Sequence, residues 1–167
     1  KPEYLELKDI KLSANPLVII LETVEKPGNL GAILRTAYAA KVDAVIIADQ
    51  QTDIYNPNVI RASMGRVFTN QVAAADTPEI MAWLKKNKIK SYGATTKAKK
   101  YYHQTDLKKA CAIVMGTEAT GLSAKWLKAL DEELKIPMQA KIDSLNVSVS
   151  TAIIAYEAQR QRNFIDF

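Results

Sequence analysis

Short apolar segments alternate with helix-like segments along the chain, and this alternation limits the folds that are possible. Five segments are rich in valine and isoleucine without sustained polar alternation, which is typical of strands covered on both faces. They span residues 17–24, 44–48, 71–75, 89–95 and 111–116, and a sixth short strand is expected just before Pro137. Helices are expected at residues 29–40, 58–63, 78–87, 123–131 and 145–161. The pattern predicts an α/β fold with a mainly parallel sheet flanked by helices.

The size and composition of the chain fit one domain without a membrane segment. A chain of 167 residues can bury a substantial core as a single domain. Its longest apolar runs are far shorter than the roughly 20 residues that span a bilayer, and no secretory signal is recognisable. The single cysteine, Cys111, lies in an apolar run and is interpreted as a buried thiol in a reducing compartment. We therefore expect a cytoplasmic protein.

Positive charge is concentrated in one stretch of the sequence. The net charge is +5, but residues 85–109 contain nine lysines and one acidic residue, Asp106. This stretch carries +8 and the rest of the chain −3. Lysines beside Tyr101, Tyr102 and His103 could contact phosphates and stack on bases. A solvated loop and helix end is the equally weighted alternative.

Three polar or glycine-rich blocks follow predicted strands, where parallel α/β sheets bind their ligands. The first block, K-P-G-N-L-G-A-I-L-R-T-A, occupies residues 26–37. Asn29 suits the N-cap of the following helix, and the missing side chain of Gly31 leaves space one turn before Arg35. Without further information, Arg35 is more readily a surface or ion-pair arginine. The glycine fingerprints of dinucleotide-binding proteins and of P-loops are absent from the sequence.

The second block, I-V-M-G-T-E-A-T-G-L-S at residues 113–123, runs from a buried strand into a turn with two glycines. Glycine permits close approach of the backbone to a ligand, or a positive φ angle. The lone carboxylate of Glu118 lies in this turn. A plain strand–turn–helix joint, with Ser123 as the helix cap, is the alternative interpretation.

The third block, I-P-M-Q-A-K-I-D-S-L-N-V-S at residues 136–148, leads from a short strand through a polar loop into an apolar helix. Asp143 or Ser144 as the helix N-cap explains the polar pair. Asn146 is a weak helix former in the first turn of a buried helix, where a polar side chain needs a partner. The apolar stripe of this helix is expected to consist of Val149, Ala152, Ile153 and Tyr156, and Val147 with Ile154 extends the apolar surface around it.

Together these blocks resemble the motifs of the SpoU/TrmH family of RNA 2′-O-methyltransferases, within the SPOUT superfamily. The matching segments are N-L-G-A-I-L-R-T-A, V-M-G-T-E-A-T-G-L, and I-P-M followed by S-L-N-V-S. R-A-S-M-G at residues 61–65 also resembles a family segment. The resemblance covers residues 15 to 162. Arg66 departs from the small residue that is common at its position, and the departure bears on the substrate rather than on the chemistry.

The resemblance implies a parallel α/β domain with a C-terminal deep trefoil knot, a topology that no periodicity could have predicted. It implies a homodimer with the active site near its interface, and the cofactor S-adenosylmethionine bound in the knot. The reaction would methylate a ribose 2′-hydroxyl in structured RNA. Ribosomal RNA is favoured over transfer RNA because residues 56–68 resemble ribosomal members. No metal and no membrane is expected as a partner.

The resemblance also assigns residues, by motif position. The cofactor pocket would be formed by Thr95, Gly116, Ile136 and Leu145. The catalytic and RNA-positioning set would be Asn29, Arg35, Glu118, Ser144 and Asn146. Because a guanidinium with a pKa above about 12 rarely gives up its proton, we expect Arg35 to grip the phosphate next to the target and to stabilise the developing oxyanion. Glu118 and Asn146 would orient Arg35 and the ribose, and Ser144 would hold the loop.

Two expectations concern the extent of the chain and the alternatives to methyl transfer. Because the chain begins with Lys1, residues 1–14 are expected to be an N-terminal extension, or the remnant of a linker to a missing RNA-binding domain. Residues 15–167 would be the SPOUT methyltransferase domain. The main alternative function is a non-catalytic RNA-binding relative of the same fold, which would not need to retain the set of polar residues. A Rossmann-type dinucleotide enzyme lacks its glycine fingerprint here.

Overall fold

The computed structural model describes residues 4–24, 26–50, 53–117, 119–139, 144–165 and 167. Within them lies a six-stranded sheet of order β3-β2-β1-β5-β4-β6, in which every pairing is parallel. The strands are β1 (Leu17–Glu22), β2 (Ala44–Ala48), β3 (Val72–Ala75), β4 (Lys90–Ala94), β5 (Cys111–Met115) and β6 (Glu132–Leu134). The predicted α/β class is confirmed. The sixth strand ends before Ile136 rather than at it.

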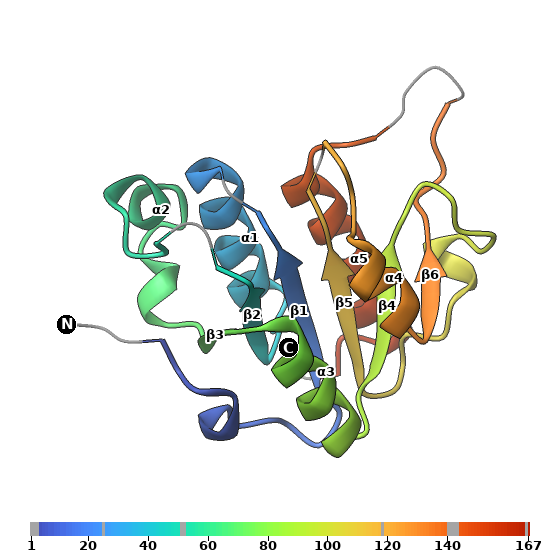
Figure 1. The fold of residues 1–167 in the computed structure, drawn as a ribbon, viewed down its shortest axis with the longest axis horizontal. Coiled ribbons are helices and arrows are strands. Elements are labelled where there is room, and N and C mark those ends of the chain that lie inside the picture. Colours follow the sequence, from blue (N-terminus) through green and yellow to red (C-terminus); the bar gives the residue numbers. More distant parts are fainter. Residues whose placement is uncertain (1–3, 25, 51–52, 118, 140–143, 166) are drawn as a thin grey trace.

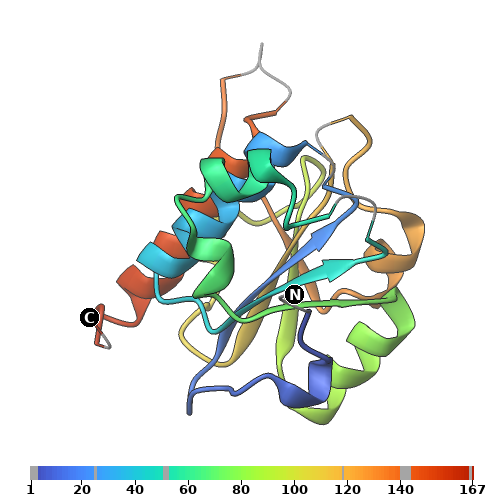
Figure 2. The ribbon, with the colours of Figure 1, turned by 90° about the vertical axis from the view of Figure 1, so that its left-hand side faces the viewer.

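Helices cover both faces of the sheet (Figures 1 and 2). The helices are α1 (Pro27–Ala39), α2 (Pro57–Ala62), α3 (Thr77–Lys86), α4 (Ala124–Ala129) and α5 (Val147–Gln161). Figure 2 shows α1, α2 and α5 on one side and α3 with α4 on the other. Three short 3-10 helices are Leu7–Asp9, Arg66–Phe68 and Tyr102–Gln104.

The central strands are buried on both faces, as their unbroken apolar sequences predicted. Side chains alternate across a strand, so Leu17, Ile19 and Leu21 of β1 join the core beneath α1 and α5. Val18 and Ile20 join a second core beneath α3 and α4. Because helices cover both faces of the sheet, a ligand cannot reach the strands from either face. It can enter at the carboxyl ends of the strands, where α/β sheets bind their ligands.

The segment before β1 packs against the sheet edge at β3. Leu5 forms a parallel bridge with Ala73, and its backbone N–H donates to the carbonyl of Val72 at 3.0 Å. Ile10 is buried in the core on the α3 side. This part of the N-terminal segment therefore covers an edge that would otherwise be open to pairing.

Two predicted helix starts were wrong. Helix α1 begins at Pro27, with Lys26 as its N-cap residue, so Asn29 lies inside the first turn. Proline needs no hydrogen-bond acceptor at a helix start, which permits the earlier beginning. Helix α3 begins at Thr77, one residue before the expected start at residue 78, and is capped by Asp76, whose Oδ1 accepts from the backbone N–H of Glu79 at 2.9 Å.

The cap of α5 also differs from its prediction. Asn146 is the N-cap residue, and its Oδ1 accepts from the backbone N–H of Ser148 at 2.9 Å. The cap role predicted for Asp143 or Ser144 is thus filled by Asn146, two residues after Ser144. Asp143 lies outside the described residues. Ser123 is the N-cap residue of α4, as predicted, but its side chain makes no capping hydrogen bond. Its hydroxyl has another partner, described below.

The apolar stripe predicted for α5 is partly exposed. Val149 and Tyr156 are 48% and 41% exposed, whereas Thr151, Ile154 and Ala158 are buried. Thr151 can be buried because its hydroxyl donates to the carbonyl of Val147 one turn earlier, at 2.7 Å. Val147 and Ile154, which extend the predicted apolar surface, are buried as expected. Apolarity alone misplaced Val149 and Tyr156, because part of the buried face is formed by Thr151, whose donor is satisfied within the helix.

Within the described part of the chain, no helix combines the length and apolarity needed to cross a membrane.

Candidate active site

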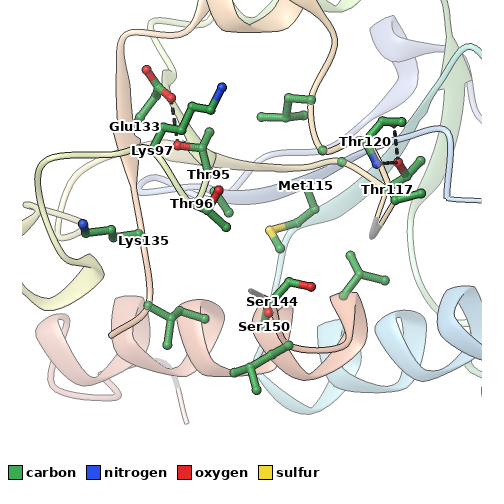
Figure 3. A pocket seen from close by; sticks show the side chains of 18 of the residues that line it. Thr95, Thr96, Lys97, Met115, Thr117, Thr120, Glu133, Lys135, Ser144 and Ser150 are labelled. Atoms are coloured by element: carbon green, nitrogen blue, oxygen red, sulfur yellow. Dashed lines mark hydrogen bonds between the residues drawn. The ribbon is translucent and has the colours of Figure 1, made fainter. Parts of the chain in front are cut away.

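A cavity of about 390 Å³ lies beyond the carboxyl ends of β4, β5 and β6 (Figure 3). Its walls come from the segments that follow these three strands and from the first turn of α5. The size lies within the usual range of small-molecule sites, and the strand ends are where α/β sheets bind ligands.

Residues far apart in sequence meet around this cavity. All four residues assigned by resemblance to a cofactor pocket line it, as does Ser144 from the predicted catalytic set. The four are Thr95, Gly116, Ile136 and Leu145. Sequence reasoning assigned no role to several neighbours at strand ends, directly after strands or in the first turn of α5. These are Thr96, Lys97, Met115, Thr117, Thr120, Glu133, Lys135 and Ser150. For all but Ser150, the position at or just beyond a strand end is the signal that could have found them.

The loop after β5 is shaped by its two glycines in different ways. A Cβ on Gly116 would lie 2.4 Å from the carbonyl carbon of Gly121, so the absence of a side chain lets the loop fold against its own backbone. Gly121 has a φ of 66°, which glycine adopts without strain. The Thr117 carbonyl accepts from the N–H of Gly121 at 2.9 Å, and the Thr117 and Thr120 hydroxyls lie 2.8 Å apart. The loop is thus a closed turn.

A buried carboxylate anchors the far end of this loop. Glu22, the last residue of β1, is 5% exposed. Its Oε1 accepts from the backbone N–H of Ser123 at 2.7 Å, and its Oε2 accepts from the Ser123 hydroxyl at 2.6 Å. Sequence analysis overlooked Glu22 because it ends an apolar strand. The signal was an acidic residue where every neighbour is buried, since a buried carboxylate requires partners.

Charged side chains border the cavity on the β6 side. Figure 3 shows Lys97 and Glu133 near Thr95, with Lys135 further along the same wall. The Thr95 hydroxyl donates to Glu133 Oε1 at 2.8 Å, and the Thr95 N–H donates to the carbonyl of Leu134 at 2.9 Å. The cavity therefore offers both signs of charge at one end and apolar walls from Met115, Ile136 and Leu145.

A hydrogen bond joins the first and third sequence blocks. The Asn146 side-chain amide donates to Asn29 Oδ1 at 3.0 Å, although 117 positions separate the two residues. It ties the first turn of α1 to the cap of α5, next to the cavity. The partner that sequence analysis required for Asn146 is therefore Asn29.

The remaining predicted catalytic residues are not gathered at the cavity within one chain. Arg35 is exposed on α1, six residues and hence about 9 Å along the helix from Asn29. It does not line the cavity. Glu118 lies outside the described residues. The space left by Gly31 is filled by α2, because a Cβ there would meet Ala62 Cβ at 2.4 Å.

Arg66, the departure noted in the sequence, lies on the same side of the molecule as Arg35. Its guanidinium is 4.2 Å from the ring centroid of Tyr38, which follows Arg35 by one turn of α1. Guanidinium stacking of this kind stabilises an exposed pair only modestly.

The one cysteine of the chain is poorly suited to act as a nucleophile. Cys111 is buried, as predicted, and burial raises the pKa of its thiol to about 11, so it is a poor nucleophile at neutral pH. No cluster of three or more His, Cys, Asp or Glu side chains suited to a metal occurs among the described residues.

Comparisons with known proteins agree on one family. A family model described as the SpoU rRNA Methylase family matches residues 16–156. The 23S rRNA (guanosine(2553)-2′-O)-methyltransferase RlmP of Bacillus subtilis (strain 168) is 33% identical over 146 residues, which are 87% of this chain and 59% of that protein. The chain thus spans about three fifths of the length of this curated relative.

Solved structures give the same result for the fold. The SpoU methyltransferase AviRb from Streptomyces viridochromogenes superposes with a TM-score of 0.92 at 27% identity, over 97% of this chain and 65% of that one. The AdoMet-bound rRNA methyltransferase from Sinorhizobium meliloti gives 0.90 at 31% identity, over 95% and 61%. These matches imply the SPOUT knot fold that the sequence motifs predicted.

Proposed function

Because this chain belongs to the SpoU rRNA methylase family, we propose that its residues 15–167 form the catalytic domain of an enzyme that methylates a ribose 2′-hydroxyl in ribosomal RNA, with S-adenosylmethionine as the methyl donor. The observation that carries the proposal is the cavity where Thr95, Gly116, Ile136 and Leu145 lie together. The name of the Bacillus relative favours ribosomal RNA as the substrate and a guanosine as the target. The buried free thiol of Cys111 fits a reducing compartment such as the cytoplasm.

The cavity suits S-adenosylmethionine in size and polarity. Met115, Ile136 and Leu145 line it and form an apolar slot for an adenine ring. Glu133 and the lysines Lys97 and Lys135 offer charges opposite to those of the amino and carboxylate groups of the methionine part. When bound, this cofactor supplies an electrophilic methyl group on a sulfonium sulfur.

The polar residues of the first and third blocks would position the ribose. Asn29 and Asn146 are already bonded to each other, so their remaining donors and acceptors are held in a fixed orientation beside the cavity. Arg35 would grip the phosphate next to the target and stabilise negative charge on the 2′-oxygen as its proton leaves to water or phosphate. Holding the reacting oxygen in line can lower the barrier by roughly 7–11 kcal/mol.

A homodimer would bring Arg35 to a cavity. Tyr38, Val149 and Tyr156 are large apolar side chains exposed on the packed pair of helices α1 and α5, and Arg35 neighbours Tyr38 on α1. Such residues are typical of a surface that another chain covers. We propose that α1 and α5 form the dimer face and that Arg35 acts in the cavity of the opposite protomer.

The test is methyl transfer to unmodified ribosomal RNA by the full-length protein with tritiated S-adenosylmethionine. The proposal predicts label in an alkali-resistant dinucleotide, which identifies a 2′-O-methyl group. The Arg35→Lys variant should bind the cofactor normally but lose roughly 100-fold in rate, because lysine cannot grip a phosphate through two parallel hydrogen bonds. Cofactor binding without transfer to any RNA would favour the non-catalytic relative, and full activity of Arg35→Lys would refute the gripping role.

Mixed dimers test the assignment of Arg35 to the opposite cavity. An Arg35→Ala chain, mixed with a chain whose cavity is blocked by Gly116→Trp, should regain transfer if Arg35 acts across the interface. Each variant alone supplies the matched control. No recovery in a verified mixed dimer would place Arg35 in its own chain's site.

A further inference from the structure

A column of stacked side chains leads away from the cavity along the edge of β6. Lys135 lines the cavity, and its Nζ lies 5.2 Å from the ring centroid of Tyr101. The Tyr101 ring stacks on His103, with centroids 5.7 Å apart and an interplanar angle of 9°. His103 is exposed and borders a second, open hollow. The cavity and the hollow are therefore connected through side chains in direct contact.

The second hollow has a basic wall. Its volume is about 410 Å³, and Lys108 and Arg160 line it together with His103. We call the set Lys99, Tyr101, His103, Lys108 and Lys135 the lysine–aromatic surface; Lys99 belongs to it as an exposed residue two positions before Tyr101. Four of its residues belong to the lysine-rich stretch at residues 85–109, and the proposed active site gives those four no role.

Several of its charges are available to a ligand. Among the described residues, Lys99, Lys108 and Lys135 make no ion pair. Of the acidic groups nearby, Glu132 pairs with Lys90 and Lys100. Glu157 pairs with Arg160 at 2.8 Å, so the charge of this arginine in the wall of the hollow is already compensated and the lysines carry the attraction. The Asp106 carboxylate accepts from the backbone N–H of Lys108 at 3.0 Å and is the one acid that lines the hollow.

The surface is held in place by backbone hydrogen bonds. The Tyr102 N–H donates to the Lys135 carbonyl at 2.8 Å, and the Lys135 N–H donates to the Lys100 carbonyl at 3.1 Å. On the other side, the Gln161 side chain of α5 bonds the N–H of Leu107 and the carbonyl of Thr105, at 2.8 and 2.9 Å. A platform fixed in this way loses little conformational entropy when a ligand binds.

We propose that the lysine–aromatic surface binds a single-stranded segment of the RNA substrate adjacent to the methylated nucleotide. Lysines that track a phosphate backbone beside an exposed ring that can stack on a base are the combination by which proteins bind single strands. An acidic peptide would use the lysines but would gain nothing from a planar ring stack. This inference rests on the proposed function, because it assigns the surface to the substrate of the adjacent cavity.

The test measures the affinity of the full-length protein for a fluorescein-labelled oligoadenylate of about 12 nucleotides, by fluorescence anisotropy over a series of salt concentrations. The test variants are Lys99→Ala/Lys108→Ala and His103→Ala. The matched controls are Lys85→Ala/Lys86→Ala, which removes two exposed lysines at the end of α3, and His103→Phe, which keeps a planar ring.

The proposal predicts that Lys99→Ala/Lys108→Ala lowers the affinity for the oligonucleotide about tenfold. The slope of the logarithm of the binding constant against the logarithm of the salt concentration should become shallower by about 1.4, because each of two lost phosphate contacts to a single strand contributes about 0.7. His103→Ala should weaken binding about fivefold or more, and His103→Phe should restore it. The Lys85→Ala/Lys86→Ala control should differ from wild type by less than about twofold.

Equal losses in the test and control lysine variants would overturn the proposal, as would tighter binding of polyglutamate than of the oligonucleotide. Calorimetry with S-adenosylmethionine is run on the same samples. Failure of the wild type to bind this cofactor would count against the proposed function, whereas unchanged RNA affinity in the test variants counts against the surface alone.

Discussion

Replacing Gly116 with alanine should impair cofactor binding more than it impairs folding. The added Cβ would lie 2.4 Å from the carbonyl carbon of Gly121, 2.5 Å from its oxygen and 2.6 Å from the Leu122 nitrogen. Non-bonded carbon atoms require at least about 3.5 Å, so the turn must open by about 1 Å. Because all the clashing atoms belong to backbone, no side chain can rotate away to relieve them.

The consequence should be visible in three measurements. A misplacement of about 1 Å can cost about 100-fold in reaction rate, so methyl transfer should slow by roughly that factor, and calorimetry should show weaker binding of S-adenosylmethionine. Overpacking costs about 1–3 kcal/mol, which lowers the thermal midpoint by about 3–9 °C in a chain of this size. Gly28→Ala is the matched control, because a Cβ there meets nothing within 4 Å. Wild-type affinity in a folded Gly116→Ala protein would refute the claim that this turn shapes the cavity.

Further predictions concern two buried groups. Glu22→Gln should lower the thermal midpoint by several degrees and weaken cofactor binding, because hydrogen bonds to a charged group contribute about 1.5–3 kcal/mol. The control Glu79→Gln, at an exposed position of α3, should change neither quantity. A Glu22→Gln protein with unaltered midpoint and affinity would contradict the anchoring role. Cys111, whose pKa is raised from 9.0 to about 11, should react with a thiol reagent at pH 8 only upon unfolding; rapid labelling of the native protein would contradict its burial. The folded state retains the thiol proton to a higher pH than the unfolded state. The contribution of the protonated thiol to the free energy of unfolding is therefore complete below about pH 9 and is lost as the pH rises toward 11. Cys111→Ala should remove that part of the pH dependence of urea unfolding.

The fold class could be predicted because it depends on local pattern. Strands such as Leu17–Glu22 are buried on both faces and therefore apolar at every position. The four residues that line one cavity, Thr95, Gly116, Ile136 and Leu145, were assigned through the resemblance to a family, and the position of the first three after strands agrees with that assignment. Thr95, Gly116 and Ile136 follow strands, and parallel strands end at one edge of a sheet. The sequence predicted that the Asn146 side chain requires a hydrogen-bond partner, but not that the partner is Asn29, because the two residues are brought together only by the tertiary fold.

The errors have physical causes in individual residues. Val149 and Tyr156 of α5 were wrongly predicted to be buried, because Thr151 bonds within the helix and can take part of the buried face despite its hydroxyl. The N-cap assigned to Asn29 moved because Pro27 starts α1 earlier. Glu22 was missed because a single carboxylate at the end of an apolar strand leaves no periodic signal, although its two bonds to Ser123 hold the cavity loop.

A crystal structure of the full-length protein with S-adenosylmethionine would test the central claim most directly. We expect density for the adenine ring between Gly116, Ile136 and Leu145, and the methionine part directed toward Lys97 and Glu133. Density for the ligand at any other site, with this cavity empty at a concentration that saturates binding in solution, would contradict the account.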